Sequence, residues 1–340
     1  MKKLLTILFA SAVITSCSVG KSDGVIKPGE RTGGIFGLMK EDDLKVESKG
    51  AFEGTEEVVV ASFKVGFVEK KTDSSQARGG LMGGGFGGKS SAKMDLTGVN
   101  DSIRQEIAEQ AYKDFVAQLK AKGFKVSPSS EILKDKDFSE TKTYDTPYVD
   151  NQGGLISTTN VTKYFQPKEL GKIRFFLGDN INITGGFGFG NPTIVASNIA
   201  EKTKKKILSV TYIVDFSNAE GDSGVSYSTL QVGQGITVTP GSKLNLIGGN
   251  GSPFSPANGN ITVGQPVYST KEFGEVISTS SDAYKATETA LNLASALMGG
   301  GTNQTRSFTV KANPSKYKAV SLEVLKDANS GIVGKMASIK

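Results

Sequence analysis

The sequence of 340 residues contains no histidine, no tryptophan and a single cysteine, Cys17. Without histidine, neither a Ser-His-Asp nor a Cys-His nucleophilic site can be assembled. The usual ligands of zinc, copper and haem are missing as well, so we expect no catalytic residue, no metal and no cofactor. One cysteine forms no internal disulfide bond, and we therefore expect the fold to depend on its own core.

Charge and apolar content are both modest. Hydrophobic residues make up 37% of the chain, aromatic residues 8%, and the formal net charge is +6. No long Lys/Arg block is interleaved with aromatics, so we expect no binding to nucleic acid. The densest basic segment, 202–206, follows a predicted helix and is interpreted as a solvated helix end, with contact to anionic lipid headgroups as the alternative.

The amino terminus has the pattern of an export signal. Met1-Lys2-Lys3 is cationic, and Leu4 to Ile14 is an uncharged apolar run. A bilayer-spanning helix needs about 20 apolar residues, so this run is too short to be a lasting anchor. The segment 1–16 is therefore predicted to be a cleaved signal peptide.

The box Ile14-Thr15-Ser16-Cys17 resembles a bacterial lipoprotein signal, in which the cysteine is acylated and becomes the new amino terminus. Ile replaces the commoner Leu and Ser replaces the commoner Gly or Ala. The alternative is an ordinary secretory signal that is cut nearby. Ser18 lacks the acidic character that favours retention at the inner membrane, so the resemblance implies lipid anchoring through Cys17 at the periplasmic face of the outer membrane.

Residues 17–50 are rich in Gly, Ser and charge, and we predict that they form a flexible tether. An apolar run then predicts a strand over 56–68, followed by a low-complexity stretch at 70–93. A stripe of apolar residues at i+4 spacing predicts a helix from Asn100 or Asp101 to Gly123, and a short strand follows at 124–127. The order strand, helix, strand is that of a βαβ unit.

The rest of the chain is predicted to be β-rich, with helices at its end. We expect a helix over 192–205 capped by Asn191, a strand over 207–216, and β segments within 225–249 that break at 233–235 and at 240–241. A helix over 280–298, a strand at 306–310 and a helix opening at Asn313-Pro314 complete the chain. The predicted class is α+β, with a body over 51–340 that divides optionally into subdomains 51–133 and 134–340.

The segment Gly83 to Ser90 matches the phosphate-loop pattern G-x-x-x-x-G-K-[ST]. That loop works only where it leaves a strand and opens a helix directly, because the phosphates then meet backbone amides at a helix terminus. Here the predicted strand ends near Val68 and the helix begins at about residue 100. We therefore interpret the match as accidental.

Apolar side chains in the glycine-rich loops are candidate interaction residues. They are Leu81, Met82 and Phe86 in the first loop, and Phe187 and Phe189 in the second. Such loops can become ordered on a protein partner or at a lipid surface. The alternative is that the first loop is a disordered insertion between a strand and a helix.

Acidic residues occur in two clusters, Glu41-Asp42-Asp43 and Asp135/Asp137. A glycosidase needs two carboxyl groups on opposite sides of a cleft, roughly 5–9 Å apart, and neighbouring loop acids do not imply that geometry. No calcium-loop spacing is present either. We interpret both clusters as solvated loop charges.

The pattern from Val58–Phe63 through the helix to Leu119-x-x-x-Gly123-Phe124-x-Val126 resembles a group of periplasmic α/β domains. The group includes the curli-secretion lipoproteins, the lipoproteins that activate penicillin-binding proteins, and the amino-terminal domain of TolB. The resemblance covers 56–130, while the insertion at 70–93 and the β-rich stretch after 206 depart from the simplest members. It implies a non-enzymatic role in binding or assembly and transfers no catalytic residue.

Three functional hypotheses follow. The first is a lipid-anchored binding or assembly factor for envelope proteins or peptidoglycan. The second is an oligomeric secretion or pore component whose glycine-rich loops, near 79–88, 185–190 and 248–251, form the contact or membrane elements. The third is a carboxylate-dependent hydrolase of cell-wall glycan.

Overall fold

One large mixed sheet organises the chain, and the predicted α+β class is confirmed. The computed structural model describes residues 17–33, 39–77, 88–152, 160–179, 191–224, 227–249, 257–297 and 302–340. Fourteen strands share the sheet, whose main path runs β15-β16-β6-β5-β10-β12-β13-β4. The predicted signal peptide over 1–16 lies outside the described residues.

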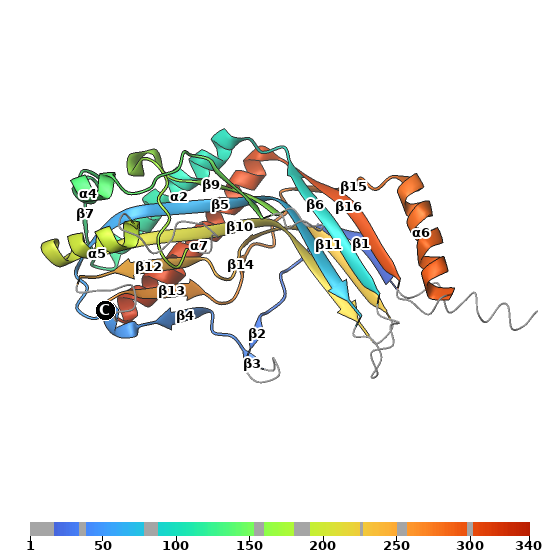
Figure 1. Ribbon diagram of the computed structural model, residues 1–340, viewed down its shortest axis with the longest axis horizontal. Coiled ribbons are helices and arrows are strands. Elements are labelled where there is room, and N and C mark those ends of the chain that lie inside the picture. The colour runs from blue at the N-terminus through green and yellow to red at the C-terminus, as the bar shows by residue number, and fades with distance from the viewer. Residues whose placement is uncertain are drawn as a thin grey trace, which may run out of the picture.

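Two long parallel strands form the centre of the sheet. They are β5 (Glu57–Gln76) and β10 (Lys206–Ser223), which pair from Lys206↔Val58 to Val214↔Phe67. Their first halves are apolar and buried, whereas their second halves are polar and run beyond the helices (Figure 1). Both strands are longer than predicted, because their polar ends are held by pairing with other strands and not by burial.

The polar ends belong to two hairpins. β5 turns into β6 (Lys89–Thr97) with pairing from Lys70↔Asp95 to Gln76↔Lys89, and β10 turns into β11 (Ser228–Val238). The prediction of a low-complexity interruption over 70–93 is therefore wrong for its two flanks. We use the name sheet extension for β1 (Cys17–Val25), β6, β11 and β16 (Asn303–Ala312) with the second halves of β5 and β10 (Figure 1).

The predicted strand-helix-strand unit is confirmed, with the β5–β6 hairpin inserted before its helix. α2 (Asp101–Ala121) begins at the cap residue Asn100, whose Oδ1 accepts a hydrogen bond from the Ile103 N–H at 3.0 Å. Gly123 ends it in the left-handed region, at φ +82°. β7 (Lys125–Ser127) then pairs in parallel with the start of β5.

Helices cover both faces of the central strands. On one face α2 and α7 (Pro314–Ser338) pack on a core in which the Phe63 ring contacts Tyr112, Phe115 and Tyr212, with centroids 5.5–5.7 Å apart. On the other face, α5 (Pro192–Thr203) packs with the short helices α3 (Ser130–Leu133) and α4 (Lys136–Ser139). Strand residues 58, 60 and 63 face the first core, and 59 and 61 face the second.

The remaining elements range in length from two to 16 residues. They are β2 (Thr32–Gly33), β3 (Met39–Lys40), β4 (Leu44–Glu47), η2 (Lys49–Ala51), β8 (Tyr148–Gln152), β9 (Asn160–Phe165), η3 (Lys168–Leu170), β12 (Lys243–Ile247), β13 (Gly259–Val263), β14 (Val267–Tyr268), β15 (Gly274–Ser278), α6 (Asp282–Leu297) and β16 (Asn303–Ala312). The sheet is continuous from residues of the 51–133 segment to those of the 134–340 segment, because β10 pairs directly with β5.

The prediction of a flexible tether over 17–50 is wrong. β1 (Cys17–Val25) pairs in parallel with β11 from Cys17↔Ser228, and β4 pairs with β13. The composition of this segment is typical of a linker, but the backbone hydrogen bonds of β1 and β4 are made with strands more than 200 residues away. The segment that begins at Cys17 is therefore part of the sheet.

Glu57 joins three segments near the start of β5. Its carboxylate lies 2.8 Å from Lys125 Nζ and 2.9 Å from Lys205 Nζ, and it accepts a 2.5 Å hydrogen bond from Ser127 Oγ. The hydrogen bonds from Lys125, Ser127 and Lys205 lower the pKa of Glu57 from 4.5 to about 2.

We expect Glu57→Gln to lower the free energy of unfolding at neutral pH but not in strong acid. A depressed pKa contributes stability above the unfolded value of 4.5, and that contribution is lost as the pH falls towards about 2. Urea unfolding of the two proteins between pH 7 and pH 2 measures the difference. A gap that does not change with pH would contradict this assignment, and Glu53→Gln, at an exposed position, controls for the loss of one carboxylate.

Asn329 is a buried polar residue in the middle of α7. Its Oδ1 accepts a hydrogen bond from Tyr212 OH at 2.9 Å, and its Nδ2 donates to Ala111 O at 3.0 Å and to Asp114 Oδ2 at 2.8 Å. One amide thus joins α7, α2 and β10 where all three are buried.

We expect Asn329→Leu to destabilise the fold by about 1–3 kcal/mol, since it leaves the fully buried Tyr212 hydroxyl without its acceptor. Chemical denaturation measures the loss. In the Asn329→Leu/Tyr212→Phe double variant, part of the stability should return. If the double variant is destabilised by the sum of the two single effects, the hydrogen bond has no role of its own.

Candidate functional site

Cys17 lies at the far end of the sheet extension, where it is the first residue of β1. Its thiol is half-buried and donates to Thr302 O at 3.1 Å. A Cβ added to Gly88 would lie 2.3 Å from Cys17 Sγ and 2.5 Å from Thr302 O, so only glycine fits between them. The Cys17 sulfur therefore lies against Gly88, the residue before β6, and Thr302, the residue before β16.

Five strands meet around this cysteine. Ser228, its neighbour across the ladder, donates from Oγ to Ser75 O and accepts at its carbonyl from Ser90 Oγ, both at 2.8 Å. The residues on either side of 78–87, 225–226 and 298–301 all lie here as well. We call this end of the extension, defined by Cys17, Ser75, Gly88, Ser228 and Thr302, the anchor end.

Alkylation of Cys17 would remove one hydrogen bond at the anchor end. An S-alkylated Cys17 has no S–H to donate, so its bond to Thr302 O would be lost. That carbonyl also accepts from the Lys89 N–H at 3.1 Å, and it therefore keeps a partner. Acylation would leave no buried acceptor unsatisfied at this position.

The other predicted interaction residues, Leu81, Met82, Phe86, Phe187 and Phe189, lie outside the described residues. Of the phosphate-loop match over 83–90, the described part is not at a helix start. Lys89 and Ser90 open strand β6, and the next helix begins at Asp101. The strand-loop-helix geometry that phosphate binding requires is therefore not formed there.

The acidic clusters of the sequence have local structural roles. Glu41 lies 2.9 Å from Lys45 Nζ. Asp135 caps α4, with its Oδ1 accepting from the Phe138 N–H at 3.1 Å. Neither of these contacts places two carboxylates across a cleft.

A buried ion pair was missed by the sequence analysis. Lys64 on β5 is fully buried, and its Nζ lies 3.1 Å from Asp179 Oδ2, 2.8 Å from Ser62 Oγ and 3.0 Å from Ser209 Oγ. Burial lowers the pKa of Lys64, and attraction to Asp179 offsets only part of that shift. Lys64 is the only charged residue in 58–68, the apolar part of the predicted strand. That single charge was the one sequence signal for a buried ion pair.

A second charged group lines a surface hollow of about 270 Å³. Lys71 Nζ lies 2.8 Å from Asp215 Oδ2 and 3.1 Å from Asp73 Oδ2. Burial lowers the pKa of Lys71, but the attraction of both carboxylates outweighs it and the pKa is raised. Burial raises the pKa of Asp73 against the opposing effect of Lys71. Both carboxylates contact one ammonium, so they are not arranged as the separated acid and base of a glycosidase.

Two further properties bear on the class of site. Among the residues with assigned positions, no three His, Cys, Asp or Glu side chains lie close enough together to hold a metal ion. No helix in the described part of the chain is both long enough and apolar enough to cross a membrane.

Comparison with protein-family models, with curated proteins and with solved structures finds no match to this chain. The anchor end, assembled from Cys17 and its neighbours on four other strands, therefore provides the main basis for a functional proposal.

Proposed function

We propose that this chain is an exported lipoprotein, anchored through acylated Cys17 to the periplasmic face of the outer membrane, and that its α+β body acts as a non-enzymatic binding or assembly factor for other envelope components. The observation that carries the proposal is the position of Cys17. It follows the apolar run Leu4 to Ile14 after only Thr15 and Ser16, and it is also the first residue of a strand at one end of the molecule.

The physical basis for anchoring is the burial of acyl chains. Each buried CH₂ contributes about 0.8 kcal/mol, so several chains on one cysteine hold the protein firmly at a bilayer. Because β1 begins at the acylated residue, no linker would separate the anchor end from the lipid surface. The body, with its helices, would then extend away from the membrane towards the periplasm.

In vivo crosslinking tests the binding role. Wild-type protein and an exported Cys17→Ser variant are crosslinked in intact cells, captured under denaturing conditions and compared. We expect envelope proteins or peptidoglycan fragments to be crosslinked to the anchored form and much less to the variant. If the same amounts of envelope components were crosslinked to both forms, a role that depends on anchoring would be contradicted.

A second candidate function, an oligomeric secretion or pore component, is favoured by the sheet extension. Its two hairpins, β5–β6 and β10–β11, project beyond the body, and the last paired residues of both, Gln76↔Lys89 and Ser223↔Ser228, lie at the anchor end (Figure 1). Projecting strands are ready templates for pairing with another chain. Crosslinking and sizing of detergent-extracted protein should then give a ring-sized assembly, and a clean monomer with protease-sensitive glycine loops would contradict it.

A further inference from the structure

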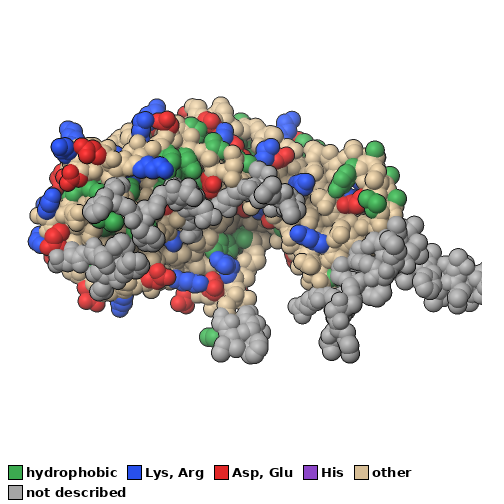
Figure 2. All heavy atoms as spheres, in the orientation of Figure 1, with side chains coloured by type: hydrophobic (Ala, Val, Ile, Leu, Met, Phe, Trp, Pro, Cys, Tyr) green, Lys and Arg blue, Asp and Glu red, His purple; other side chains and the backbone are tan. Residues whose placement is uncertain are grey.

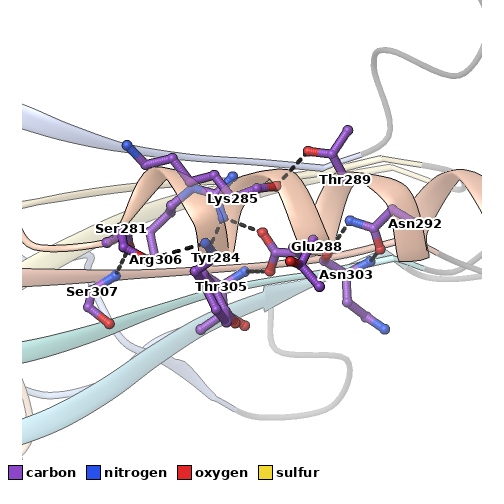
Figure 3. A network of polar contacts seen from close by, with 12 residues as sticks. Ser281, Tyr284, Lys285, Glu288, Thr289, Asn292, Asn303, Thr305, Arg306 and Ser307 are labelled. Atoms are coloured by element: carbon purple, nitrogen blue, oxygen red, sulfur yellow. Dashed lines mark hydrogen bonds and ion pairs between the residues drawn. The ribbon is translucent and has the colours of Figure 1, made fainter.

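Helix α6 is attached to the sheet extension by polar side chains. β15 pairs with β16 only over Phe308–Ala312, and in the described part of the chain no strand pairs with the preceding residues along that edge. There, Glu288 Oε1 accepts from the Thr305 N–H at 2.5 Å, and Glu288 also pairs with Arg306. Asn292 exchanges two hydrogen bonds with the backbone of Asn303, at 2.5 and 2.8 Å (Figure 3).

These contacts set the rotation of the helix. Glu288 and Asn292 are four residues apart and share the face turned to the strand. Tyr284 and Leu291 are seven residues apart, lie on one stripe beside that face, and remain 48% and 67% exposed. None of the described side chains of α6, over 282–292, is buried.

The outer surface of this region carries exposed apolar side chains, together with the exposed Asp282 at the start of the helix. Ile277 on the neighbouring strand β15 is also exposed, and Figure 2 shows hydrophobic side chains gathered over the position of α6. The charges of α6 are paired, Lys285 with Asp282 at 3.0 Å and Glu288 with Arg306. From Thr289 to Thr305 the sequence has no charged residue.

The second half of α6 lies beside the anchor end. Asn292 bonds to Asn303, and the residue before it, Thr302, is the one whose carbonyl accepts from Cys17 Sγ. An acyl chain on Cys17 would therefore bring a lipid surface next to the uncharged half of the helix. With 16 residues, α6 is shorter than the about 20 that a bilayer crossing needs.

We propose that the exposed face of α6, marked by Tyr284 and Leu291, rests on the same lipid leaflet that holds the acylated Cys17. This inference depends on the proposed lipid anchor. The helix lies along the membrane interface, where amphipathic helices bury an apolar face among headgroups. Its contact gives the body a defined orientation, which acyl chains alone do not provide.

The absence of tryptophan from the chain allows a direct test, because one substitution introduces a single fluorescent indole. Acylated Tyr284→Trp protein is bound to phosphatidylethanolamine/phosphatidylglycerol vesicles with and without bromine on the acyl chains. The matched control is Tyr268→Trp on β14, where the tyrosine is 40% exposed. We expect brominated lipid to quench the fluorescence of the Tyr284→Trp protein strongly and to leave that of the control unchanged. Adding Leu291→Glu to the Tyr284→Trp protein should reduce the quenching.

Vesicle flotation separates the inference from the anchor on which it depends. If the acylated Tyr284→Trp protein does not float with vesicles, the anchor itself is refuted. If it floats but its indole is not quenched by bromine and is open to iodide, the helix faces water and the inference is overturned. If the indole is shielded from iodide but insensitive to bromine, a second protein copy covers the helix, which overturns the lipid assignment as well.

Discussion

Replacing Lys64 with methionine is expected to destabilise the protein by about 3–5 kcal/mol, because it leaves a buried carboxylate without its cation. Asp179 is buried, with only 1% of its side chain exposed, and its Oδ2 lies 3.1 Å from Lys64 Nζ. Its Oδ1 accepts from Thr211 Oγ1 at 2.9 Å, and Oδ2 accepts from the Phe176 N–H at 2.8 Å. These neutral donors do not replace a positive charge in an environment from which water is excluded.

The double variant Lys64→Met/Asp179→Asn provides the matched control. An amide keeps an acceptor for the Phe176 N–H and removes the charge, so the double variant should be more stable than the single one. Urea unfolding followed by circular dichroism measures both. A single variant within about 1 kcal/mol of wild type, in the range of exposed ion pairs, would show that Lys64 does not hold Asp179 in place.

Cys17→Ser is expected to abolish association with the outer membrane. Serine keeps a hydroxyl that can donate to Thr302 O in the place of the thiol, so the fold of the anchor end should be preserved. It cannot form the thioether, and each acyl CH₂ that is not buried removes about 0.8 kcal/mol of membrane affinity. The variant should remain unprocessed, or appear as a soluble exported protein.

Fractionation of cells into soluble and membrane parts measures this effect, with Ser18→Ala as the control that leaves the cysteine intact. Thermal unfolding of the body should be the same for wild type and Cys17→Ser. A processed Cys17→Ser protein that still sediments with the outer membrane would contradict anchoring through this residue.

The helices of the fold could be predicted because their signals are local. Caps were expected at Asn100 or Asp101, at Asn191 and at Asn313. The side chains of Asn100, Asn191 and Asn313 each accept from a backbone N–H in the first turn of α2, α5 and α7. Proline at the first position strengthened two of these signals. The parallel pairing of β5 with β7 followed from the strand-helix-strand order.

The sheet extension could not be predicted, since its strands are defined by partners far along the chain. The second half of β5, over 69–76, is polar and resembles a loop until β6 is placed beside it. β11 was expected to break at 233–235, yet it runs through those glycines while paired with β10. β1 was assigned to a tether for the same reason.

The candidate site was predictable only in part. Cys17 was identified from the residues that precede it, which is a local signal. Its contacts with Gly88 and Thr302 could not be anticipated, because they join segments 71 and 285 residues away. The exposed face of α6 was hidden as well, since the sequence does not tell which side of that helix the β16 edge occupies.

Mass spectrometry of the amino-terminal peptide of the mature protein tests the central claim most directly. We predict a peptide that begins at Cys17 and carries a diacylglyceryl thioether, with a further acyl group on its amino nitrogen where the host adds one. A mature chain that begins elsewhere, or one that begins at Cys17 with a free thiol, would contradict the lipid anchor and with it the placement of the sheet extension at the membrane.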